Sequence, residues 1–179
     1  MAATGRGHNA NVMKPRAFLR ASLLAFALTL PPPLLALAPG DAAPALALPT
    51  AQDGPIALDG LRGKVVYVDF WASWCGPCKR SFPWMAEMQR RYGDRGFTVL
   101  AVNVDKRRAD ADRFLQATPA GFPVVFDDSG RTPAAWQVKG MPSSYLVDPA
   151  GHILHVESGF RDEQRDAVEA KIRAALAAR

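Results

Sequence analysis

The sequence is poor in cysteine and histidine, and this scarcity limits the chemistry open to it. Cys75 and Cys78 are the only cysteines among 179 residues, and the only histidines are His8, His152 and His155. A structural zinc site needs four ligands. His8 precedes a leader-like segment, and the other two differ by an odd number on an expected strand, which places them on opposite faces. We therefore expect no metal site.

A basic surface that could bind nucleic acid is also missing. The formal charge of +5 is uneven, because four basic residues and one acid precede residue 46 and leave only +2 for the rest. The one basic run, at 106–108, is followed by Asp110 and Asp112, as at a solvated helix start. No basic stripe with interleaved aromatic residues occurs, so we expect no nucleic-acid partner.

The N-terminal region lacks an apolar run long enough to span a bilayer, which takes about 20 residues. Three basic residues, Lys14, Arg16 and Arg20, precede an apolar stretch at 21–30, and three prolines follow at 31–33. This pattern is typical of an export signal. It favours a cleaved signal over an uncleaved anchor, and such an anchor would be the only membrane contact.

The position of cleavage stays open between Ala45 and Ala47, and translation could start at Met1 or Met13. No cysteine follows the apolar stretch, which excludes a lipoprotein, and no arginine pair precedes it, which argues against twin-arginine export. We expect residues 1–48 to form the export signal or signal-anchor and a linker. Residues 49–179 would form one folded domain, located in the periplasm or cell envelope.

Strand-like and helix-like segments alternate along this expected domain. Continuous apolar runs predict buried strands, and apolar residues at helical spacing predict helices. A small hairpin or edge strand is expected at 55–58. The order that follows is β-α-β-α-β-α-β-β-α, which implies an α/β domain with a central mixed sheet covered on both faces. The expected strands are 65–71, 97–104, 121–126, 143–147 and 152–156, and the expected helices are 75–91 (kinked at Pro83), 105–118, 132–138 and 162–177.

The two cysteines lie between an apolar strand and a helix, in the run Trp74-Cys75-Gly76-Pro77-Cys78-Lys79. At a helix start, residues three apart share a face, so the two sulfurs can close a small ring. The unpaired N–H groups and the dipole of the helix favour a thiolate at Cys75, while Cys78 lies deeper. Pro77 suits the first turn. This arrangement indicates a reversible dithiol/disulfide with Cys75 attacking and Cys78 resolving, and no other cofactor.

Two other interpretations of the pair are weaker. Half of a zinc site lacks its remaining ligands. A purely structural disulfide that closes so short a loop would remove little entropy from the unfolded chain.

The run W-C-G-P-C-K, directly after V-D-F-W-A-S, resembles the active site of the thioredoxin superfamily. The resemblance covers about residues 55–178 and implies a thioredoxin fold. Between residues 105 and 142 there is room for an extra helix and strand, inserted before the cis-proline loop. With the export signal, this insertion makes the chain similar to the TlpA/ResA group of exported thiol–disulfide oxidoreductases.

Asp69 interrupts the apolar strand 65–71. A buried carboxylate is costly unless it is paired or protonated, and the alternative is a solvated face. The resemblance implies that Asp69 is the acid that relays the proton of Cys78. ResA-like proteins often lack an acid here, so the sequence departs toward ordinary thioredoxins.

The resemblance also assigns supporting residues. Met141-Pro142 would be a cis-proline loop whose Met141 backbone pairs with an extended substrate. Trp74 would be partly exposed and shield Cys75, whereas Trp71 would pack in the core. Lys79 would stabilise the thiolate or simply be an exposed helix lysine.

Gly76-Pro77 between the cysteines is the thioredoxin dipeptide, and the resemblance therefore favours a reductant of protein disulfides. Its electrons would come from a membrane thiol transporter, and cytochrome c maturation is the first candidate role. Oxidation or isomerisation of dithiols remains an alternative. A thiol peroxidase would need a threonine a turn before the cysteine, where residues 72–74 read Ala-Ser-Trp. A copper-binding assembly module would need a wider cysteine spacing and a distal histidine.

Overall fold

A computed structural model of the chain describes residues 1–2, 4, 36–51 and 53–178. The chain divides into two compact units, Met1–Leu34 and Leu35–Arg179, and every helix and strand below lies in the second. The basic and apolar parts of the expected export signal lie outside the described residues. Within the described residues, no helix has the length and apolar character needed to cross a membrane.

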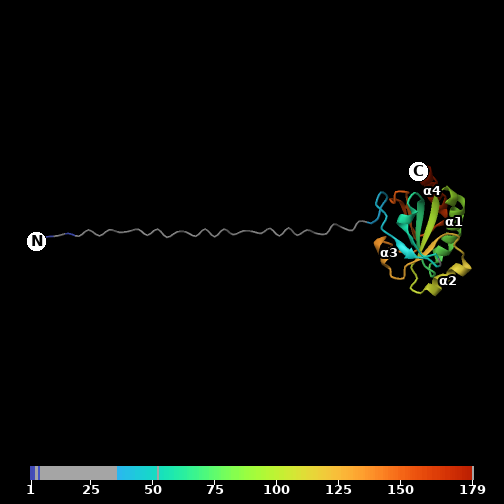
Figure 1. Cartoon of the computed structure of the whole chain (residues 1–179), viewed down its shortest axis with the longest axis horizontal. Coiled ribbons are helices and arrows are strands. Elements are labelled where there is room, and N and C mark those ends of the chain that lie inside the picture. The colour runs from blue at the N-terminus through green and yellow to red at the C-terminus, as the bar shows by residue number, and fades with distance from the viewer. Residues whose placement is uncertain (3, 5–35, 52, 179) are drawn as a thin grey trace. The chain divides into compact units, whose positions relative to one another are not determined.

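A five-stranded mixed sheet forms the centre of the second unit (Figure 1). The two central strands carry the sequences VVYVDFW and FTVLAVN and are buried at every position, as expected for strands covered on both faces. β3, β4 and β5 run parallel, whereas β6 and β7 are antiparallel to their neighbours. The order across the sheet is β5 (Val124–Phe126), β4 (Phe97–Asn103), β3 (Val65–Trp71), β6 (Ser143–Val147) and β7 (Ile153–Ser158).

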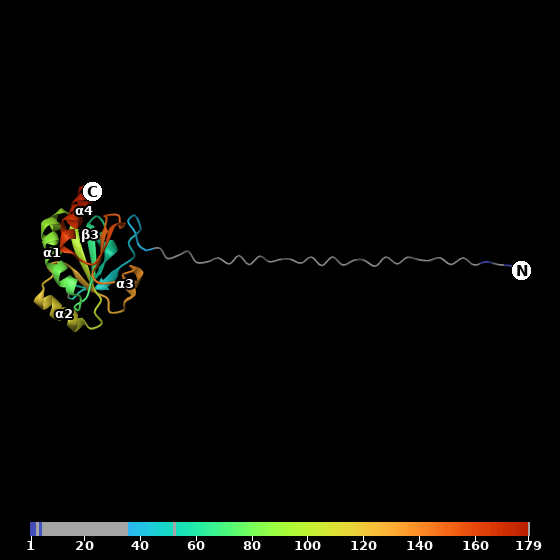
Figure 2. The ribbon, with the colours of Figure 1, turned by 180° about the vertical axis from the view of Figure 1, so that it is seen from behind.

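Helices cover both faces of this sheet. α1, α2 and α4 pack their apolar sides on one face, together with Tyr67, Trp71 and Val99 of the sheet. On the other face, Trp136, which follows α3, packs with Phe70 and Tyr145. Figure 2 shows α1 and α3 on opposite sides of β3. The helices are α1 (Gly76–Tyr92), α2 (Arg108–Ala117), α3 (Arg131–Ala135) and α4 (Arg165–Ala177), with short 3-10 segments at Leu58–Leu61, Gly93–Arg95 and Asp162–Gln164.

The element order expected from residue 65 onward is confirmed, and α2, β5 and α3 occupy the region between residues 105 and 142. β5 and α3 are shorter than the strand at 121–126 and the helix at 132–138 that we expected. We expected the kink at Pro83 to leave the active-site turn as a separate segment, and this is wrong, because α1 is one continuous helix across that residue. Pro83 lies on the exposed side of α1, where water can reach the carbonyl that lacks a backbone donor.

The folded unit begins before residue 49, where we expected it to begin. β1 (Ala47–Pro49) pairs antiparallel with β2 (Pro55–Ala57), the edge strand that we expected. Leu46 is buried, and the Gly40 N–H donates to the Ile153 carbonyl at 2.8 Å. The composition of this Ala/Leu/Pro stretch resembles a linker, and only its contacts with β2 and β7 give it a fixed place. Cleavage after Ala45 or Ala47 would remove part of this packed segment.

Candidate active site

Cys75 and Cys78 form a disulfide at the start of α1, with their Cα atoms 5.3 Å apart. Cys75 is the N-cap residue, and the backbone N–H of Cys78 donates to its sulfur at 3.2 Å. Gly76 and Pro77 form the first two helical positions, where proline has no N–H to lose from the helix ladder. The exposed fractions are 3% for Cys75 and 0% for Cys78, so Cys78 is the more deeply buried of the two, as expected. An N–H aimed at the Cys75 sulfur can stabilise a thiolate there once the disulfide is open.

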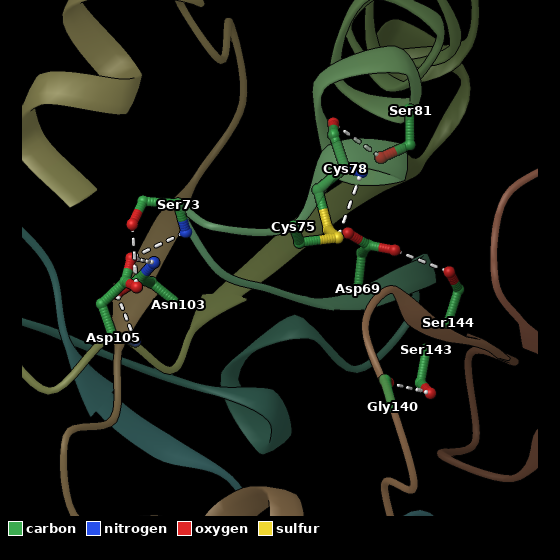
Figure 3. Close-up of a disulfide and its surroundings, with 10 residues drawn as sticks. All are labelled: Asp69, Ser73, Cys75, Cys78, Ser81, Asn103, Asp105, Gly140, Ser143 and Ser144. Carbon is green, nitrogen blue, oxygen red and sulfur yellow. Dashed lines mark hydrogen bonds between the residues drawn. A yellow bond between two sulfur atoms is a disulfide. The ribbon is translucent and has the colours of Figure 1, made fainter. Parts of the chain in front are cut away.

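The loop that connects β3 to Cys75 is fixed by a carboxylate from the next strand (Figure 3). Asp105 follows β4 and accepts from the Ser73 N–H at 2.9 Å and from the Ser73 hydroxyl at 3.0 Å. The Asn103 side chain donates to the same carboxylate at 2.9 Å, and its own oxygen accepts from the Asp105 N–H at 3.1 Å. Sequence reasoning missed these three residues, because Asp105 has the appearance of an ordinary helix start. The only signal was two polar residues at the end of a buried strand.

Asp69 is buried, with an exposed fraction of 1%, and its carboxyl is directed toward the disulfide (Figure 3). The alternative of a solvated face is therefore excluded. The Ser144 hydroxyl donates to its Oδ1 at 2.6 Å, and its Oδ2 has no hydrogen-bond partner among the described residues. Burial raises the pKa of Asp69 from 3.8 to about 7, and the Ser144 hydrogen bond opposes that rise only in part. The carboxyl can therefore gain and lose a proton near neutral pH.

Two tryptophans precede Cys75 closely in sequence but lie in opposite environments. Trp74 is 71% exposed, more than the partial exposure that we expected. Trp71 is fully buried, with its ring centroid 4.8 Å from Phe82 and 4.7 Å from Phe114. The expected packing role of Trp71 is confirmed. Lys79 is exposed on the first turn of α1.

The Met141–Pro142 peptide bond is cis, as the resemblance implied. Ser143, the next residue, pairs with Phe70 near the end of β3, so the loop lies at the sheet edge from which the chain leads to Cys75. The Pro142 carbonyl accepts from the Gly159 N–H at 2.8 Å. Met141 makes no backbone hydrogen bond within residues 36–51 and 53–178. Its peptide N–H and carbonyl therefore have no backbone partner in this part of the chain.

The part of the chain that the structure describes contains no group of three histidine, cysteine or acidic residues able to hold a metal ion.

Comparisons with known proteins also indicate thiol–disulfide chemistry. The AhpC/TSA family matches residues 39–156. The thiol-disulfide oxidoreductase ResA of Bacillus subtilis is 33% identical over 124 residues, which are 69% of this chain and 69% of that protein. The ResA protein of Geobacillus kaustophilus is 32% identical over 69% of this chain and 71% of its own length.

Solved structures are similar as well. A Chlorobium tepidum protein described as a thiol:disulfide interchange protein DsbE superposes with a TM-score of 0.77 at 50% identity, covering 79% of this chain and 99% of that one. The thioredoxin domain of a thiol-disulfide oxidoreductase from Bacteroides vulgatus gives a TM-score of 0.69 at 28% identity, covering 76% and 99%. The expected thioredoxin fold is thereby confirmed.

Proposed function

Because this chain belongs to the AhpC/TSA family and is a thiol–disulfide oxidoreductase, we propose that it is an exported reductant of protein disulfides. The observation that supports this most directly is the buried Asp69 carboxyl beneath the Cys75–Cys78 pair. Its pKa of about 7 suits a group that must exchange a proton at neutral pH.

The proposed reaction starts from the reduced pair. The Cys75 thiolate attacks one sulfur of the substrate disulfide, so that the S–S bond breaks and a mixed disulfide forms. The first substrate sulfur leaves as a thiolate and takes a proton. Asp69 accepts the proton of the Cys78 thiol, and the Cys78 thiolate then attacks the Cys75 sulfur. The second substrate sulfur leaves as a thiolate and takes up the proton that Asp69 received from Cys78. The two substrate sulfurs have together gained two electrons, and the cysteine pair, which supplied them, ends as the disulfide.

Two features beside the pair support a protein substrate. Trp74 offers an exposed apolar surface, and the Met141 backbone offers unpaired peptide groups. An extended substrate segment can add to such a backbone as a short strand and place its disulfide over Cys75. Gly76, Pro77 and Lys79 shape the first turn of the helix below it.

The export signal in the sequence would place this reaction in the periplasm or cell envelope. That environment is oxidising, so the Cys75–Cys78 disulfide needs a dedicated electron donor after each turnover. A membrane thiol transporter is the donor that we propose. The similarity to ResA and DsbE proteins supports apocytochrome c disulfides as the first substrates to test.

Substitution of Cys78 by serine tests this function. The variant retains the attacking Cys75 and cannot release it, so it should accumulate mixed disulfides with natural partners, which mass spectrometry of non-reduced gel bands would identify. Cys75→Ser is the matched control and should trap nothing. If Cys78→Ser traps no protein and the unmodified protein fails to reduce a disulfide substrate, the proposal is wrong.

The direction of electron flow needs a separate measurement. Equilibration of the cysteine pair with glutathione buffers gives its reduction potential, and about 30 mV corresponds to 1.4 kcal/mol for this two-electron couple. A reductant should stay oxidised in strongly reducing buffers. A pair that is readily reduced there would instead favour the oxidase or isomerase alternative.

A further inference from the structure

The carboxyl group of Asp69 has a single hydrogen-bond partner in the described chain, and that partner comes from a neighbouring strand. Strand pairing places Ala101 of β4 on one side of Asp69 and Ser144 of β6 on the other. Glu157 of β7 lies beyond Ser144 in the same row. Cys78 lies above this row, on α1, which packs on this face of the sheet. Strand pairing thus places the Ser144 hydroxyl directly beside the acid, and the same hydroxyl also makes a side-chain hydrogen bond with Tyr67.

The two oxygens of this carboxyl are not equivalent. Ser144 holds Oδ1 at 2.6 Å, whereas Oδ2 is buried without a donor. Figure 3 shows the carboxyl directed toward the disulfide on one side and toward Ser144 on the other. A hydroxyl that donates to Oδ1 leaves Oδ2 as the atom on which a proton resides when the acid is neutral.

We infer that Ser144 is a positioning residue: it fixes the orientation of the Asp69 carboxyl and keeps Oδ2 free to exchange a proton with the cysteine pair. This inference rests on the proposed role of Asp69 as the proton acceptor of Cys78. The inference adds a residue that orients the Asp69 carboxyl. Neither the cysteine motif nor Asp69 itself identifies that residue.

The other groups near Asp69 do not replace this hydrogen bond. Tyr67, on the same strand, remains a neutral hydroxyl, because burial and the nearby Asp69 charge both raise its pKa. Glu157 is held by Gln164 at 3.1 Å and by His155 at 3.2 Å. β4 contributes the uncharged Ala101, and α1 contributes the cysteines.

Burial raises the pKa of Asp69, and the interaction that lowers it is the hydrogen bond from Ser144. The bond favours the carboxylate over the neutral acid, so its loss must move the pKa upward.

The test is Ser144→Ala, with the Asp69 pKa followed by carboxyl carbon NMR in the oxidised protein. We expect the pKa to rise by about one pH unit, the size of a hydrogen bond to a charged group. The acidic limb of the pH–rate profile for disulfide reduction should move upward by the same amount. Asp69→Asn identifies the signal, because it removes the titration.

Ser143→Ala is the matched control. Its hydroxyl is also buried, but it donates to the Gly140 carbonyl at 2.8 Å on the other face of the sheet. This variant should leave the Asp69 pKa unchanged. Should Ser144→Ala fold poorly, the isosteric pair Ser144→Thr and Ser144→Val answers the same question, since only threonine keeps the hydroxyl and should keep the lower pKa.

An unchanged or lowered Asp69 pKa in a folded Ser144→Ala protein would overturn the inference, as would equal pKa values in the threonine and valine variants. A raised pKa with an unmoved pH–rate profile has a different meaning. It would support the positioning by Ser144 and count against Asp69 as the proton acceptor in turnover.

Discussion

Replacing Asp69 by asparagine should stabilise the oxidised protein at neutral and alkaline pH. The side chain is 1% exposed, and one of its oxygens has no donor in the described structure. Ionising it inside the fold is therefore unfavourable, and this is why its pKa is raised from 3.8 to about 7. Asparagine has nearly the same shape and never carries this charge.

The size of the effect follows from the two pKa values. At about pH 3 and below, the carboxyl is mostly protonated in both the folded and the unfolded chain, so it does not lower the stability. Between about pH 4 and 7 the unfolded chain releases the proton first, and the stability of the folded state falls as pH rises. The values differ by about three pH units at about 1.4 kcal/mol each, so the full cost above pH 7 is about 4 kcal/mol.

Urea unfolding of the oxidised proteins at a series of pH values measures this difference. Asp69→Asn should match the unmodified protein at about pH 3 and exceed its free energy of unfolding by about 4 kcal/mol at pH 8. Equal stabilities at pH 8, or a less stable variant there, would refute the argument that Asp69 is an uncompensated buried acid.

Asp127→Asn is a control for which we expect the opposite change in stability. Burial opposes ionisation of Asp127, but hydrogen bonds from Ser129 and Thr132 outweigh it and lower the pKa of this carboxyl. A lowered pKa contributes stability that is present above the unfolded-state pKa and is lost as the pH falls through the folded-state value. Asp127→Asn should therefore be less stable than the unmodified protein at pH 8, and this deficit should shrink in acid.

The remaining predictions concern the loop before the disulfide and the N-terminal segment. Asp105→Ala removes both hydrogen bonds from Ser73 to the Asp105 carboxylate. Disulfide reduction should then slow by about tenfold because Cys75 is misplaced, while the far-UV circular dichroism spectrum stays unchanged. An unaltered rate would show that the loop holds its place without Asp105. A chain shortened to begin at Leu46 loses the hydrogen bond from Gly40 to Ile153, and its free energy of unfolding should fall by about 1 kcal/mol or more; equal urea midpoints would contradict a packed role for this segment.

Local sequence was sufficient for the features that depend on neighbours in the chain. The cysteine spacing, the proline in the first turn and the buried strand Val65–Trp71 follow from residues within one helix turn or one strand. A continuous apolar strand also favoured burial of Asp69 over a solvated face, and the exposed fraction of 1% decided between the two. The element order from residue 65 was predicted from periodicity for the same reason.

Contacts between distant residues could not be predicted in this way. Ser144 reaches Asp69 across 75 positions, and Asp105 reaches Ser73 across 32. Each contact depends on strand order and register, and a shift of one residue would turn either side chain to the other face of the sheet. Gly40 likewise appeared to belong to a linker, because its fixed place depends on its bond to β7.

The sequence by itself therefore determined that this protein carries a redox-active cysteine pair at a helix start with an acid behind it. The tertiary structure decided how that acid is held, because the partner of a buried carboxyl is whichever polar side chain the sheet register places beside it.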